Sequence, residues 1–257
     1  MKLVTIEPTF AVRAMVDLYP GTVCLKEVAM TASRSPTLAL RARGPLACFT
    51  RPELKAERMS YEVPTPSAAR GLLEAVLWKP AIRWHVRRIK VLRPIDFIAF
   101  RRNEVATKAA RPSMATVKHG GEVPRYFADD DRTQRNTVAL RDVDYVIEAY
   151  LSLTERAGPD DNMTKFVDMF ERRVRKGQHF HQPYFGCREL VAEVLPAGDA
   201  PPPIDDSRDL GVMLWDVDYS PKGNRAIFFR ARLEHGVLEV PEDPVASFAA
   251  AAEGGGS

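Results

Sequence analysis

The sequence has few cysteines and no long apolar run, and each absence excludes a class of protein. Its three cysteines, Cys24, Cys48 and Cys187, lie far apart and form no CxxC pair. A disulfide framework and a zinc site are therefore unexpected, as in a reducing cytoplasm. No apolar stretch approaches the roughly 18 residues that a membrane helix needs. Residues 1–10 lack a basic segment leading into an apolar core, so we expect no secretory signal and no membrane partner.

The composition is that of a folded protein. The chain has 257 residues, of which 45% are hydrophobic and 28% charged, and these are ordinary globular values. This length allows one large domain or two small ones, each with a real core.

The net charge of +3 is small, but the charge is unevenly distributed. Residues 34–111 hold 17 Lys/Arg and 6 Asp/Glu, whereas residues 190–257 hold 5 Lys/Arg and 12 Asp/Glu. This asymmetry predicts a face that binds a polyanion such as a nucleic acid. The alternative is a solvated surface that is merely uneven.

The two ends of the chain do not resemble domain sequence. Residues 1–35 hold scattered apolar residues and a second methionine at Met30, so we expect an N-terminal extension, disordered or not native to the protein. Residues 249–257 (AAAAEGGGS) are typical of a flexible tail. The expected units are a main domain over 36–195 with a long insertion at 104–142, and a C-terminal β-rich subdomain over 196–248.

Periodicity predicts an α+β fold. Two helices have clear signals: one starts at Thr65-Pro66, and the other carries an apolar stripe from Met163 to Val174 and ends at Gly177. Strands are predicted at 38–43 (ended by Gly44-Pro45), 82–92, 95–100, 143–153 and 187–195, and further strands at 210–219, 225–233 and 237–240. The order strand, helix, strand, strand, helix, strand is the ferredoxin-like βαββαβ pattern, with a C-terminal antiparallel β extension.

The insertion at 104–142 is a polar span of 39 residues without convincing periodicity. Structureless loops of this size are uncommon in compact domains and tend to be functional. We expect this one to reach around a ligand.

Alternation along residues 82–92 places Arg83, His85 and Arg87 on one outward face. Arg101 and Arg102 follow the next predicted strand, so all four arginines are expected to converge on a phosphate backbone. Trp78 and Trp84 are expected in the core.

Several ordered blocks between residues 37 and 240 resemble the Cas5 subunit of type I-C CRISPR systems, a member of the RAMP superfamily. They are RGPLACFTRPE at 43–53, SYEVPTPSAARG at 60–71, WKPAI at 78–82, RRNE at 101–104 and QPYFGCRE at 182–189.

The resemblance implies a ferredoxin-like domain and a metal-independent endoribonuclease without cofactors. Such a protein cuts precursor CRISPR RNA in the repeat by attack of a 2′-hydroxyl, which leaves a 2′,3′-cyclic phosphate. It then stays on the 5′ handle and caps the Cascade complex, beside the backbone and large subunits, and meets target DNA through that complex in the cytoplasm. In the family an insertion comparable to 104–142 acts as a thumb.

Family members use a tyrosine just before the Trp-Lys-Pro block and a Lys-His pair early in the second helix. Here these positions hold Leu77 and Lys165-Phe166. Lys165 can supply a cation, but Leu77 and Phe166 transfer no proton. The expected catalytic residues are Lys165, His85 and Tyr61, with His179 and His181 as further proton carriers. The expected RNA-binding residues are Arg43, Arg51, Lys79, Arg83, Arg87, Arg101, Arg102, Lys118, Arg172, Arg173, Arg175 and Gln178.

Two other functions remain open at this point. One is a structural subunit that holds the handle while another nuclease matures the RNA. The other is a generic RRM-like module, which the basic rather than aromatic strand faces disfavour.

Overall fold

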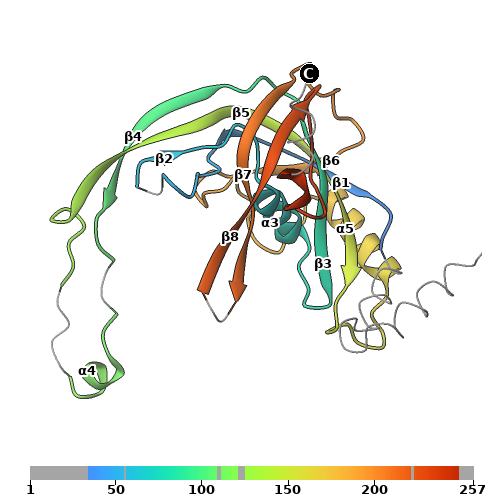
Figure 1. Ribbon diagram of the computed structural model, residues 1–257. Coiled ribbons are helices and arrows are strands. Elements are labelled where there is room, and N and C mark those ends of the chain that lie inside the picture. Colours follow the sequence, from blue (N-terminus) through green and yellow to red (C-terminus); the bar gives the residue numbers. More distant parts are fainter. Residues whose placement is uncertain (1–33, 55, 109–110, 121–124, 221–222, 249–257) are drawn as a thin grey trace, which may run out of the picture.

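The computed structural model describes residues 34–54, 56–108, 111–120, 125–220 and 223–248. Of the extension predicted at 1–35, residues 1–33 lie outside the described residues, as does the tail at 249–257. Ser35, by contrast, is buried and exchanges hydrogen bonds with Leu151 as part of the fold. The fold is α+β, with one large sheet and few helices (Figure 1). The elements are β1 (Leu38–Ala47), β2 (Arg58–Met59), α3 (Pro66–Val76), β3 (Ile82–Val91), β4 (Phe97–Val105), α4 (Met114–Lys118), β5 (Arg132–Leu153), α5 (Met163–Arg175), β6 (Glu193–Pro196), β7 (Arg208–Ser220), β8 (Gly223–Glu234) and β9 (Val237–Glu239).

The main path of the sheet runs β6-β1-β5-β3-β9-β8-β7, with every neighbouring pair antiparallel. β2 pairs with β5 in parallel. Because β9 pairs with β3, the C-terminal strands continue the same sheet instead of forming a second one. Among the described residues no helix is both long and apolar enough to cross a membrane.

The two long helices form where their start signals predict. The Thr65 hydroxyl accepts from the Ala68 amide at 3.1 Å, and Asn162 caps α5 in the same way through the Lys165 amide. α3 packs on β3 and β7, whereas α5 packs on β5 and β6. The Trp84 and Phe170 rings meet at 4.7 Å in the shared core, so the prediction for Trp84 is confirmed.

The predicted structureless span at 104–142 is largely an arm. β4 pairs with residues 132–140 of β5, and the two strands run out of the body together towards α4 (Figure 1). The exposure of β4 alternates between exposed and half-buried, with no buried position. Ile98 and Phe100, near the body, pack against a small apolar cluster, but from Arg101 outward β4 offers no apolar face, so the sequence of this outer part lacks the alternation that marks a strand.

The expectation that Arg83 and Arg87 lie on a strand beside Arg101 and Arg102 is wrong. β3 pairs with residues 145–153 of β5, whereas β4 pairs with residues 132–140. The 22-residue β5 thus pairs with β4 along its first half and with β3 along its second half. The two arginine pairs therefore belong to separate surfaces.

Two further strand boundaries differ from the prediction. β1 does not end at Gly44-Pro45 but continues to Ala47, because Gly44 and Leu46 both keep partners on β5. A Cβ at Gly44 would lie 2.8 Å from the Val191 carbonyl oxygen, so glycine allows the neighbouring loop to approach. In the predicted strand at 187–195 only the last residues pair as a strand, β6, while Val191 forms an isolated bridge with Tyr184 and a turn precedes it.

Candidate nucleic-acid interface

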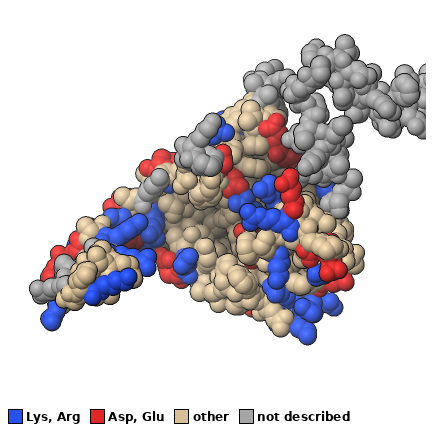
Figure 2. Space-filling view, turned by 90° about the horizontal axis from the view of Figure 1, so that it is seen from below, with Lys and Arg blue, Asp and Glu red and all other residues tan. Residues whose placement is uncertain are grey.

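A groove of about 1160 Å³ lies between α3, β3, the end of β5 and β7. Seen from below, basic side chains gather beside a hollow in the body and, separately, along the arm (Figure 2). The charged residues that line the groove are Arg34, Arg70, Lys79, Arg83, Arg87 and Arg156, with Glu74, Glu155, Asp216, Asp218 and Glu242.

Ion pairs divide these cations into two groups. Arg70 pairs with Asp216 and Glu74, and Glu242 pairs with both Arg34 and Arg87 at 2.9 Å. The other three, Lys79, Arg83 and Arg156, have no ion-pair partner within the described part of the chain. These three are therefore free to meet the phosphates of a ligand. Arg34, Arg70 and Arg156 were not predicted from the sequence.

His85 lies half-buried in this groove. Its Nε2 is 2.8 Å from the Ser152 hydroxyl, and its ring stacks on Tyr150 at 4.7 Å. Burial lowers the pKa of His85 to about 4, assisted by the positive charges of Arg83 and Arg34. At neutral pH the ring is thus uncharged, and the low pKa makes it a weak base.

Acidification should destabilise the fold through His85. Its pKa is about 4 in the folded protein against an ordinary 6.5, so the unfolded chain binds the proton first. The free energy of unfolding is therefore unaffected by protonation of His85 above pH 6.5, where the ring is neutral in both states. It decreases as the pH falls from 6.5 towards 4. His85→Gln should flatten this decrease in urea unfolding measured from pH 7 to pH 4.5. His179→Gln, a change at an exposed histidine, is the control; an unchanged slope in H85Q would contradict the assignment.

Lys165 lies at the start of α5 with a half-exposed side chain. Its Nζ is 2.9 Å from Asp161 Oδ1. The pKa of Asp161 is lowered mainly by this hydrogen bond and also by Lys79. Two lysines thus act on one carboxylate near the groove, to which Lys79 belongs. The neighbouring family positions Leu77 and Phe166 are buried in the core.

Tyr61, the third predicted catalytic residue, does not line the groove. Its side chain is 1% exposed, and its hydroxyl accepts from the Leu214 amide at 3.2 Å. The Arg51 guanidinium lies 4.5 Å above its ring, so this predicted RNA-binding residue is also engaged within the fold. The structure therefore places His85 in the lining of the groove, leaves Lys165 outside that lining beside Asp161, and keeps Tyr61 inside the core.

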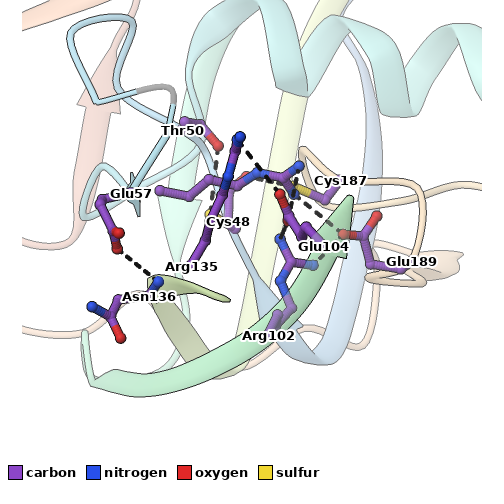
Figure 3. A network of polar contacts seen from close by, with 10 residues as sticks. Cys48, Thr50, Glu57, Arg102, Glu104, Arg135, Asn136, Cys187 and Glu189 are labelled. Carbon is purple, nitrogen blue, oxygen red and sulfur yellow. Dashed lines mark hydrogen bonds and ion pairs between the residues drawn. The ribbon is translucent and has the colours of Figure 1, made fainter. Parts of the chain in front are cut away.

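A charged network fixes the root of the arm (Figure 3). Glu104 accepts ion pairs from Arg58 at 3.4 Å, Arg102 at 3.1 Å and Arg135 at 3.7 Å. Arg102 also pairs with Glu189 in the loop after α5. Its guanidinium is thus occupied by carboxylates, whereas Arg101 stays exposed beside Gln134 and Asn136.

Two thiols lie in the same network. The Cys187 thiol donates to the Cys48 carbonyl at 3.8 Å, and Arg58 approaches the Cys187 sulfur at 3.5 Å. Hydrogen bonding from Cys187 lowers the pKa of the Cys48 thiol, whereas the pKa of Cys187 is raised. Both cysteines are free.

The remaining predicted RNA contacts differ in availability. Arg173 donates to the Val76 carbonyl at 2.7 Å and so caps α3. Arg43 pairs with Glu193 at 2.7 Å between β1 and β6, and β1 lies two strands away from β3 in the sheet. The exposed ones are Lys118 on α4, Arg172 and Arg175 on α5, and Gln178.

Trp78 contradicts the prediction that it lies in the core. Its side chain is 48% exposed and lines the groove. Trp78 follows the C-cap of α3, where helical periodicity has ended and no longer indicates which side a residue faces. Phe180, which the prediction did not single out, is exposed beside it.

Comparisons with known proteins agree on one family. The family model described as CRISPR-associated protein (Cas_Cas5) matches residues 37–241. A protein of Mannheimia succiniciproducens named CRISPR pre-crRNA endoribonuclease Cas5d is 46% identical over 79% of this chain and 94% of its own length. The protein of the same name from Thermus thermophilus is 40% identical over 80% of this chain and 92% of its own.

A solved structure described as a CRISPR-associated protein has a similar fold. It matches with a TM-score of 0.60 at 22% identity and covers 84% of this chain and 96% of its own. At this identity the likeness concerns the fold alone.

Proposed function

Because this chain belongs to the CRISPR-associated Cas5 family, we propose that it cuts precursor CRISPR RNA within the repeat. The two relatives named as pre-crRNA endoribonucleases support this activity, since each is matched over more than nine-tenths of its length. The product then stays bound by its 5′ handle, and the protein caps a type I-C Cascade complex in the cytoplasm. Its partners there are the backbone and large subunits.

The finer fold assignment belongs to the same proposal. The path β6-β1-β5-β3, with α3 and α5 in the crossovers, has the strand order of a ferredoxin-like βαββαβ unit. The arm is then an insertion between the second and third strands of that unit. β7, β8 and β9 extend its edge through β3.

The observation that carries the proposal is a groove in which Lys79, Arg83 and Arg156 have no ion-pair partner among the described residues, with Lys165 linked to Lys79 through their shared neighbour Asp161. Attack of a 2′-hydroxyl on the adjacent phosphate builds negative charge on the phosphorus centre, and a nearby cation stabilises it. Lys165 has the charge and the exposure for this role. The neutral ring of His85, although a weak base, is the groove-lining group that would accept the proton of the 2′-hydroxyl when the RNA lies along β3. The step needs no metal.

A second function is supported by one specific observation. Two of the three family catalytic positions hold the buried apolar residues Leu77 and Phe166. A protein with these residues could bind the handle as a structural subunit while another nuclease cuts the repeat.

Incubation of the purified protein with its repeat hairpin in excess EDTA separates the two functions. We expect one cut, with a cyclic-phosphate end, that disappears when the nucleotide at the cut carries a 2′-deoxy sugar. Intact RNA under conditions of saturated binding would support the structural subunit instead.

The salt dependence of RNA binding should show whether the cations of the groove contact phosphates. Arg83→Ala combined with Arg156→Ala removes two free cations, so the slope of log K against log salt should decrease by about 1.4, or about 0.7 per phosphate contact. Arg88→Ala with Arg225→Ala removes the same charge outside the lining of the groove. If both double variants change the slope equally, the groove is not the binding surface.

A further inference from the structure

Four aromatic rings form a continuous strip that leads away from the groove. Trp78 meets Phe180 with ring centroids 6.4 Å apart, Phe180 meets His181 at 6.1 Å, and His181 meets Tyr184 at 6.2 Å. Trp78 is 48% exposed and Phe180 is 65% exposed. Large rings that are left this exposed lose the stabilisation of burial, so such a surface commonly marks a binding site.

The fold holds this strip outward with hydrogen bonds at the end of α3. The amides of Phe180 and His181 both point to the Ala75 carbonyl, at 2.6 and 3.4 Å. Arg173 occupies the next carbonyl, that of Val76. These donors satisfy the free carbonyl groups in the last turn of α3. They also hold the loop after α5 against the end of α3. The rings are thus presented by an anchored segment.

The charge around the strip favours an anionic ligand. Lys79 follows Trp78 directly, and the exposed Arg175 and Lys176 precede the loop at the end of α5. One carboxylate, that of Glu74, also lies nearby: burial raises its pKa, and His181 is close enough to lower that pKa in part. Aromatic faces beside exposed cations are what unpaired nucleotides bind, because the bases stack while the phosphates meet the charge.

We infer that Trp78 and Phe180, with His181 and Tyr184, form a stacking site for unpaired nucleobases of the RNA that flanks the groove. The inference rests on the proposed function for the identity of the natural RNA. The site itself needs only a single-stranded ligand, since stacking accepts any base. A protein partner on the same rings is the competing occupant.

Affinity measurements with a uridine decamer and with the repeat RNA test the site. Trp78→Ala and Phe180→Ala should each weaken binding of both RNAs by about 5-fold to 100-fold, as expected for one lost stack. The salt slope should stay unchanged, because no charge is removed. Trp78→Phe and Phe180→Tyr keep a ring and should keep most of the affinity. Phe248→Ala, a change at an exposed ring elsewhere, is the matched control.

Abasic substitution in the decamer gives the decisive comparison. If a base stacks on Trp78, removing that base from the RNA should lower the affinity of the wild-type protein for it. The affinity of the Trp78→Ala variant should not change. Unchanged RNA affinity in both alanine variants would overturn the site. Unchanged RNA affinity with lost co-purification of the other subunits would assign the strip to a protein partner and also overturn it. Wild-type protein that binds the decamer through the strip but never cuts the repeat would contradict only the proposed function.

Discussion

Lys165→Ala should lower the rate of repeat cleavage by about 100-fold or more, because removing one preorganised charge donor from a reacting anion costs this much. Affinity for the repeat RNA should change by no more than about 3-fold, since one half-exposed lysine contributes a single contact among many. Single-turnover cleavage and filter binding on the same preparation measure the two effects.

Lys165→Arg is the matched control for this prediction. It keeps the positive charge and the contact with Asp161, so it should retain far more activity than K165A. If cleavage and binding decrease together in K165A, or if neither changes, Lys165 does not have the proposed role.

Arg41→Ala should give the largest loss of stability, about 3–5 kcal/mol in the free energy of unfolding. Arg41 Nε and Nη2 donate to the two carboxylate oxygens of Asp144 at 2.9 and 2.6 Å. The Asp144 side chain is 4% exposed, so the substitution leaves a buried charge without its partner. Urea unfolding followed by circular dichroism measures the loss.

Arg141→Ala supplies the comparison on the same sheet. Arg141 pairs with Asp96, but both side chains are about half exposed. Solvent screens such a pair, and its loss should cost under about 1 kcal/mol. Equal losses in R41A and R141A would show that burial does not set the strength of the Arg41 pair.

The elements with local signals were predictable from the sequence. Thr65 and Pro66 predict the start of α3, and the apolar stripe from Met163 to Val174 predicts α5, because capping and periodicity lie within a few residues. The strands β7, β8 and β9 also follow from their alternation. That β9 pairs with β3 and so joins these strands to the main sheet did not follow from the order of the elements.

The arm was not predictable in this way. Only the first residues of β4 fall within the strand predicted at 95–100, because the outer residues, from Arg101 to Val105, have no apolar face to alternate. The pairing of β4 with the first half of β5 depends on backbone hydrogen bonds, which most side chains tolerate.

The candidate site was predicted in part for a similar reason. The alternation of β3 before its bulge at Val86–Arg88 placed Arg83 and His85 on one face, and both line the groove. Arg102 and Arg173 have partners 87 and 97 residues away, so no local pattern could show that they are engaged. The exposure of Trp78 likewise depends on the distant loop that contains Phe180.

The most direct test of the central claim, that repeat RNA lies along the groove, is to crosslink it to the protein. Repeat RNA that contains 4-thiouridine would be irradiated with the full chain, and the attached peptides identified by mass spectrometry. We expect crosslinks within residues 78–87 and 175–184. Crosslinks confined to residues 223–248, or none at all under saturated binding, would contradict the account.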